Sequence, residues 1–245
     1  MKRMIVCAFV AATLVGNAGA QDRNIEHRRT YAVKRDRIAD WESTIKELNA
    51  VYKKANVDAP TLVFQSLTGP DRFLVVRYYE KVSQAVSNRT AAFKNNHEAE
   101  YMTLNMRLGA YVDDRETRVS ERDGELSLPR PTEIPPYIRT IRTVVKPGHV
   151  DEFRALVKEW VNAGLKPGGV KTYIISQTRM GGATTEFLSG TGVQALTELD
   201  ESAPRKAMGE AKFKAWMAKR DAVMNYSEVN LYRYRPELSN WQPVK

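Results

Sequence analysis

A stretch of fifteen residues occurs twice in this chain, and the repeat limits the folds that the chain can adopt. Residues 33–47 read VKRDRIADWESTIKE and residues 145–159 read VKPGHVDEFRALVKE, so the copies align without a gap at a spacing of 112. In both copies the apolar residues recur at steps of three and four, which places them on one face of a helix. Each copy therefore predicts the end of a strand followed by an amphipathic helix. We expect Trp41 and Trp160 on these helices to pack in the core rather than to bind a cofactor.

The spacing of 112 recurs far from this stretch. The other matched pairs are Gln65 with Gln177, Tyr101 with Phe213, Leu104 with Trp216, and Glu116 with Glu228. Around the third strand of each copy the spacing shifts, and Phe73-Leu74 aligns best with Phe187-Leu188. We interpret the chain as a duplication of one unit.

The first twenty residues have the pattern of a secretory leader. A basic start, Met-Lys-Arg, precedes an apolar run that ends in Ala18-Gly19-Ala20. The run is too short to span a membrane, so we expect cleavage after Ala20 and export to the periplasm or the medium. The single cysteine, Cys7, lies in this leader. The predicted mature chain therefore excludes disulfides, thiolate catalysis and thiolate metal sites.

The whole chain carries a formal net charge of +9 at pH 7. Its charges are interspersed, apart from a basic cluster that begins at Arg28. Nucleic-acid binding is one interpretation, but for an exported protein we expect a soluble basic surface that attracts anionic ligands or surfaces.

Propensities and turn signals give the same order of elements in both copies, β-α-β-β-α-β, which is the ferredoxin-like split motif. We expect a flexible lead-in over 21–28, a first unit over 29–127 and a second unit over 137–245. In the first unit the expected elements are strands at 29–34, 61–67, 72–79 and 115–121, a helix from about 38 to 55, and a long helix over 83–111. In the second unit they are strands at 137–146, 172–178, 184–189 and 228–234, a helix over 150–163, and helical sequence over 193–224. Four prolines in residues 128–136 predict a linker between the units.

The segment Lys146 to Phe153, in which a strand ends in Lys-Pro-Gly and a helix opens with Asp-Glu-Phe, resembles the dimeric α/β-barrel superfamily. The resemblance implies an α+β fold in which two ferredoxin-like units press their antiparallel sheets into one barrel, here within a single chain. The superfamily includes monooxygenases without cofactors, isomerases, haem-degrading enzymes and proteins without known activity, so the fold does not choose a function.

Histidine offers one candidate cofactor ligand. In haem-degrading members of the superfamily a helix histidine ligates iron, so the resemblance makes His97 the candidate haem ligand. The alternative is a solvated helix residue. We expect no metal site, because no H-x-x-H, H-E-x-x-H or acidic metal-loop spacing occurs. We therefore expect no cofactor, with haem as the alternative.

Polar residues on the predicted strands are the other candidates for ligand binding. They are Gln65, Arg77, Tyr79, Tyr173, Gln177 and Glu228. Arg139 and Arg142 lie on opposite strand faces, so at most one of them points into a barrel. A buried arginine needs a carboxylate, which Glu116 or Glu228 could supply. These residues could equally form a structural ion pair or an exposed sheet edge.

Two classes of function fit these observations. The first is non-catalytic binding of a small molecule or a partner protein by a monomeric pseudo-dimer or a homodimer. The alternative is a cofactor-independent monooxygenase or isomerase. An enzyme needs a cavity that an ionisable group faces, whereas a filled barrel favours the binding protein.

Overall fold

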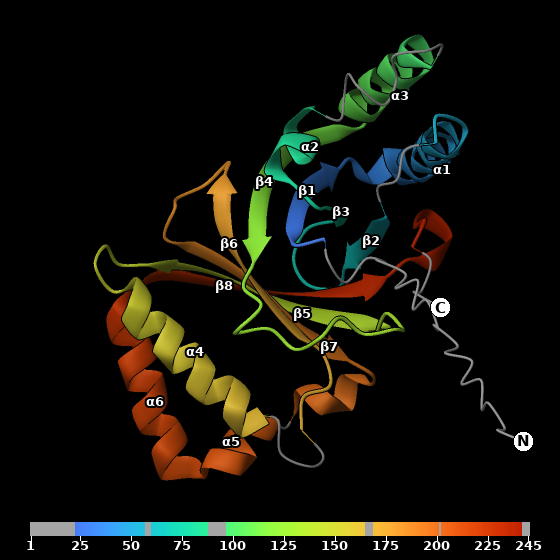
Figure 1. Cartoon of the computed structure of the whole chain (residues 1–245). Helices are drawn as coiled ribbons and strands as arrows, with labels where there is room; N and C mark the ends of the chain where they lie inside the picture. Colours follow the sequence, from blue (N-terminus) through green and yellow to red (C-terminus); the bar gives the residue numbers. More distant parts are fainter. Residues whose placement is uncertain (1–22, 57–59, 88–96, 165–168, 201, 242–245) are drawn as a thin grey trace, which may run out of the picture.

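The computed structural model describes residues 23–56, 60–87, 97–164, 169–200 and 202–241, and its centre is a closed antiparallel barrel of eight strands. Around the barrel the strands follow the order β1-β3-β2-β8-β5-β7-β6-β4. Each unit supplies four consecutive strands of this order, and the helices lie outside the barrel (Figure 1). The expected α+β fold, with two ferredoxin-like units pressed into an intramolecular barrel, is confirmed.

The first unit consists of strands and helices in the predicted order. Its elements are β1 (Ile25–Val33), α1 (Ile38–Lys54), β2 (Thr61–Ser66), β3 (Arg72–Tyr79), α2 (Val82–Ser87), α3 (Glu98–Ala110) and β4 (Val112–Arg122). The second unit repeats the order. Its elements are β5 (Tyr137–Val145), α4 (Val150–Gly164), β6 (Tyr173–Met180), β7 (Glu186–Val193), η3 (Leu196–Leu199), α5 (Ala203–Met208), α6 (Glu210–Val223) and β8 (Met224–Tyr234).

The strand bounds follow the repeat in the sequence. Strands β1 and β5 begin 112 residues apart, as do β2 and β6, and β4 and β8. Phe73 and Phe187, which are 114 residues apart, occupy matching buried positions on β3 and β7. The register inferred from the sequence, including its shift at the third strand, is therefore the structural one.

Two seams close the barrel, and each joins one strand of the first unit to one strand of the second. At one seam β2 pairs with β8, with Phe64 opposite Tyr234. At the other, β4 pairs with β6, with Ser120 opposite Thr178. Because each half-sheet covers the other's edges, the described strands form one continuous hydrogen-bonded ring.

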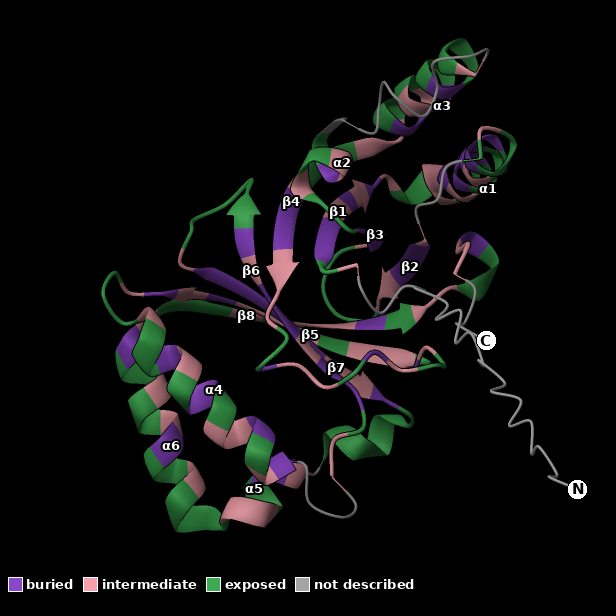
Figure 2. Ribbon diagram, viewed as in Figure 1, coloured by how far each residue is buried: buried purple, intermediate pink, exposed green. Residues whose placement is uncertain are grey.

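Each unit buries an apolar helix face against the outer surface of its own strands. In the first unit Trp41 is fully buried, and its ring lies 4.3 Å from that of Phe73, centroid to centroid. In the second, Trp216 is buried, and its indole N–H donates to the carbonyl of Leu156 at 2.9 Å. Figure 2 shows that the exposed residues of α4 and α6 face away from the barrel. Trp41 is therefore a core residue, as expected, whereas Trp160 is only half-buried.

Several predicted bounds are wrong. The expected lead-in over 21–28 runs into β1, which starts at Ile25 and buries residues 25–27. Its polar composition hid this strand, because a charged lumen accepts polar side chains on one face. The single long helix expected over 83–111 is α2 and α3, with residues 88–96 between them outside the described part. The predicted leader, residues 1–20, also lies outside it.

In the described residues, no helix combines the length and apolarity that a membrane span requires.

A tight turn between β6 and β7 gives a test of the second seam. Gly181 has a φ of 81°, and a Cβ there would lie 2.1 Å from the carbonyl oxygen of Thr117 in β4. Gly69 has a similar φ of 77° but open space around it. We expect Gly69→Ala to lower the free energy of unfolding by about 1–2 kcal/mol, the cost of the left-handed backbone. Gly181→Ala should cost clearly more, because β4 must move. Urea unfolding of both variants measures the difference, and equal losses would contradict the contact.

Candidate functional site

The inner faces of the strands form a charged lumen. Alternate residues of each strand point inward, and the pairing sets Arg28 opposite Arg118 and Arg142 opposite Glu228. The charged residues that line or adjoin the lumen come from both units: Glu26, Arg28, Arg72, Glu116, Arg118, Arg142, Glu186 and Glu228.

Glu186 holds the centre of this network. Its carboxylate accepts a hydrogen bond from Nε of Arg118 at 2.6 Å and from Nε of Arg142 at 2.7 Å. The hydroxyl of Thr178 donates to it at 3.0 Å. Glu186 is fully buried, so these donors are what makes a buried negative charge tolerable.

A second buried carboxylate, Glu26, lines the apolar chamber described below. Burial opposes its ionisation, but the charges of Arg28 and Arg130 and a hydrogen bond from Ser176 outweigh burial and lower its pKa below the ordinary value of 4.5. Arg28 reaches it at 2.6 Å and the Ser176 hydroxyl at 2.7 Å. Glu26 is therefore ionised at neutral pH and acts as a counter-ion.

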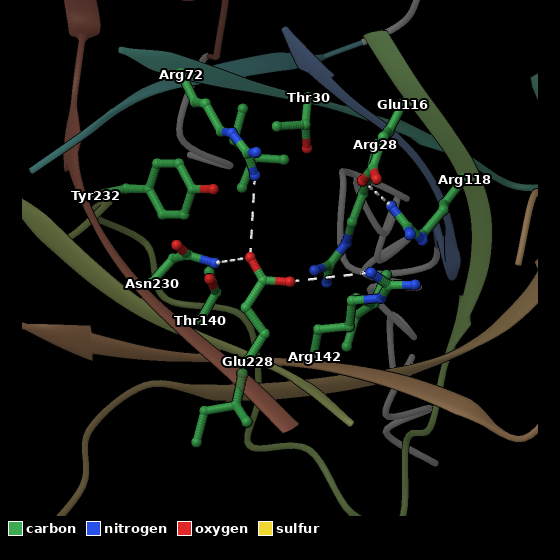
Figure 3. A pocket seen from close by; sticks show the side chains of 13 residues that line it. Arg28, Thr30, Arg72, Glu116, Arg118, Thr140, Arg142, Glu228, Asn230 and Tyr232 are labelled. Carbon is green, nitrogen blue, oxygen red and sulfur yellow. Dashed lines mark hydrogen bonds and ion pairs between the residues drawn. The ribbon is translucent and has the colours of Figure 1, made fainter. Parts of the chain in front are cut away.

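Little space remains in the lumen. A polar chamber, lined by Arg28, Arg72, Arg142, Glu228 and Tyr232 among others, has a volume of about 60 Å³ (Figure 3). An apolar chamber nearer the linker, lined by Phe64, Tyr78, Ile138 and Trp241 among others, is equally small. Pockets for organic ligands have volumes of about 300–1,000 Å³. The lumen as it stands is too full for such a ligand.

A larger hollow lies outside the barrel, on the helix side of the second unit. We call it the second-unit pocket. It has a volume of about 530 Å³ and lies over β5 and β7, between α4 and the segment η3–α5. Its lining includes Arg139, Trp160, Lys171, Thr191, Val193 and Glu198. The structure thus has a cavity of ligand size that ionisable side chains face. It lies on the outer face of the sheet, which the sequence patterns do not single out.

The residues that line the second-unit pocket suit an aromatic ligand that carries a negative charge. Trp160 packs against Tyr173 with ring centroids 4.8 Å apart and also lines the pocket. Arg139 and Lys171 supply positive charge, and neither forms an ion pair within the described residues. Desolvation and the nearby charge of Arg220 lower the pKa of Arg139. A negative ligand group beside Arg139 would favour its charged form and so oppose this lowering of the pKa.

Most of the residues predicted for ligand binding lie outside the lumen. Gln65 and Gln177 lie on the outer face; Gln65 accepts hydrogen bonds from Arg233 and Arg235, and Gln177 donates to the carbonyl of Thr184. The other three are Arg77, over the ring of Tyr52 at 4.7 Å; Tyr79, in a cluster with Ile25; and Tyr173, in the core beneath α4. Glu228 alone of the six lines the lumen. The structure does not gather them into one site.

The expectation for the buried arginine is partly confirmed. Arg142 points inward and lies 3.9 Å from Glu228, whereas Arg139 points outward. The closer partner, Glu186, was missed because the expectation considered only the closing strands.

The described residues do not form a haem site around His97. The ring of His97 lies at the start of α3 on the first unit, 3.7 Å from Glu100. The second-unit pocket is in the other half of the barrel, and its described lining contains no histidine. The described residues also contain no group of three or more His, Cys, Asp or Glu side chains placed to hold a metal ion. His97 as a haem ligand stays a prediction that this geometry does not support.

Partial signals for these missed residues are present in the sequence. Arg118 lies on β4, which is mostly polar, and Glu186 begins β7, which mixes polar, apolar and glycine residues, so neither sequence shows which face is inward. Arg139 and Trp160 stand out as a strand arginine and a helix tryptophan, but no sequence pattern places them beside the segment η3–α5 that completes the pocket wall.

The role of Glu186 can be tested by removing its charge. Glu186→Gln leaves Arg118 and Arg142 without their shared carboxylate, so the free energy of unfolding should fall by about 3–5 kcal/mol. The matched control is Glu121→Gln, which removes an exposed ion pair with Arg179 (2.7 Å) on the same barrel and should cost below about 1 kcal/mol. Denaturant unfolding compares the two, and a loss at Glu186 as small as that at Glu121 would show that the network is dispensable.

Comparisons with known proteins relate the chain to others through its fold. No model of a sequence family matches it, and no curated protein is similar to it in sequence. Among solved structures, a candidate monooxygenase from Fusobacterium nucleatum is 12% identical, with a TM-score of 0.59 over 86% of this chain and 91% of that one. An anthrone oxidase-like protein is 14% identical, with a TM-score of 0.59 over 92% and 97%. A mutant chlorite dismutase from Candidatus Nitrospira defluvii is 10% identical, with a TM-score of 0.56 over 88% and 92%. These neighbours have the dimeric α/β-barrel fold, and this chain has the same fold with both halves in one polypeptide.

Proposed function

We propose that the chain is an oxygenase that acts on an aromatic substrate with an acidic C–H or O–H group, bound in the second-unit pocket. The observation that carries the proposal is the pocket itself. At about 530 Å³ it has the size of an organic ligand, and ionisable side chains face it. The two lumen chambers, at about 60 Å³ each, are far smaller.

The lining residues suit a reaction in which the substrate itself supplies the electrons for oxygen. Glu198 is the one carboxylate among the described lining residues, and it accepts a hydrogen bond from the backbone N–H of Gln194 at 3.2 Å. It is placed to take a proton from the substrate. Arg139 would then stabilise the resulting oxyanion, and Trp160 would hold the rings. The chain needs no metal ligand for this chemistry.

The structural neighbours support this class of reaction over simple binding. They include candidate monooxygenases and an anthrone oxidase-like protein. At 14% identity or less the likeness shows the fold alone, so the substrate rests on the chemistry of the pocket.

Anthrone is the probe for this function, since its carbanion reacts with O₂ to give anthraquinone and water. We expect the chain to consume oxygen with anthrone faster than the spontaneous reaction does. Arg139→Gln should lower kcat by about 10²-fold, the usual effect of removing one oxyanion donor. Arg179→Gln, an exposed arginine on β6 outside the pocket, is the matched control and should leave the rate unchanged. An oxygen electrode and the absorbance of anthraquinone measure both.

Two results would contradict the oxygenase. Saturable binding of anthrone without oxygen uptake would favour a binding protein, and equal loss in Arg139→Gln and Arg179→Gln would exclude the pocket as the site.

We also infer that the protein is exported and works as a monomer with an internal pseudo-dimer. The leader pattern over residues 1–20 supports export, and the barrel closed within one chain supports the monomer. N-terminal sequencing and sedimentation of the protein from an expressing cell should give Gln21 as the first residue and one chain per particle. An intact Met1, or a stable dimer, would contradict the corresponding inference.

A further inference from the structure

The polar chamber of the lumen has the size of a small ion. A buried water needs about 10–15 Å³ of such volume, so about 60 Å³ holds roughly four waters. An ion of three or four heavy atoms occupies the same space, whereas the aromatic substrate proposed above does not. The chamber is therefore a different site from the second-unit pocket, on the other face of the sheet.

Arg72 lines the chamber and is only loosely paired with a carboxylate. Its Nη1 lies 3.9 Å from Glu228, too far for a hydrogen bond. Nη1 of Arg142 is also 3.9 Å from Glu228. Glu228 is instead hydrogen-bonded by the amide of Asn230 at 3.0 Å and the hydroxyl of Tyr226 at 3.1 Å. Both guanidinium groups thus keep N–H donors toward the chamber (Figure 3).

The duplication explains why β3 has an arginine at the position where β7 has a buried carboxylate. By the repeat, Arg72 in β3 matches Glu186 in β7, since 186 − 72 = 114. The two arginines that hold Glu186 match neutral residues: Arg118 matches Asn230, and Arg142 matches Thr30, each at a spacing of 112. One side of the lumen therefore has a carboxylate between arginines. The other side has Arg72 among neutral donors, with the carboxylate of Glu228 at 3.9 Å.

Neutral donors complete the chamber. The hydroxyls of Thr30 and Tyr232 point into it beside Arg72 (Figure 3). Burial raises the pKa of Tyr232, so its hydroxyl keeps its proton and donates. Arg122 and Arg130 add positive charge near Glu26, which is itself paired with Arg28.

We propose that the polar chamber binds a small planar oxyanion, of the size of formate, nitrate or bicarbonate, between Arg72, Arg142 and Tyr232. Planar oxyanions match the paired N–H donors of arginine. Because Arg72 and Thr30 come from the first unit and Arg142 and Tyr232 from the second, the bound anion ties the two halves of the barrel together and stabilises the folded chain.

Nitrate and formate are the probes, compared with chloride at equal ionic strength. We expect both to raise the unfolding temperature saturably and to give one site per chain by calorimetry. Arg72 is partly exposed, so Arg72→Gln should fold and weaken binding at least tenfold. Tyr232→Phe, which removes only a hydroxyl, should weaken binding less. The control is Arg233→Gln, on the outer face of the same strand as Tyr232, and it should bind as the natural chain does.

Absence of any saturable effect with both probes would overturn the proposal, as would equal weakening in Arg72→Gln and Arg233→Gln. Anthrone oxidation by Arg72→Gln should stay at the natural rate. The proposal of an oxyanion site and the proposal of an oxygenase are therefore tested by separate measurements.

Discussion

The carboxylate of Glu186 joins the two halves of the barrel. One of its partners, Arg118, belongs to the closing strand of the first unit, and the other, Arg142, to the opening strand of the second. A fully buried charge is stable only while both donors remain in place, so the ion pair fixes how the half-sheets meet. The hydrogen bonds at the two seams then close the ring, and the positions of all inward side chains follow from that register.

Because the lumen is filled by side chains, the space for an organic ligand lies outside the barrel. Ferredoxin-like units can hold ligands on either sheet face, inside the barrel or under the helices. Here the inner face is occupied by ion pairs and by the apolar cluster around Phe64 and Tyr78, which leaves chambers of ion size. On the outer face the helices of the second unit stand away from β5 and β7 at one end, where Arg139 and Trp160 line the second-unit pocket. Rigid strands position the base of this pocket, and the short segment η3–α5 forms its rim.

The fold could be predicted because a gapless repeat of a strand and an amphipathic helix leaves few arrangements. Which face of each strand points into the barrel could not be predicted. In an ordinary antiparallel sheet the polar face is the solvent face, but here both faces are covered, and residues such as Arg29 and Arg77 are buried under helices while Arg118 is buried in the lumen. The alternation of side chains along a strand therefore assigns residues to two faces, but it does not show which face points into the barrel. The same ambiguity hid the start of β1, where Glu26 reads as a solvated residue and is in fact buried.

The two units differ where the second one is hollow, and side-chain volume explains the difference. On the outer face of β3 the first unit has Arg77 and Tyr79, both buried. The matching positions on β7, each 114 residues later, are Thr191 and Val193, which line the second-unit pocket. Two large side chains thus correspond to two small ones, and the space that they fill in the first unit is open in the second. Arg77 and Tyr79 are candidate ligand-binding residues by sequence, yet in the first unit they pack the space that the second unit leaves for a ligand. Duplication gave the barrel two equivalent helix-covered faces, and these substitutions leave one as packed core and the other as a pocket.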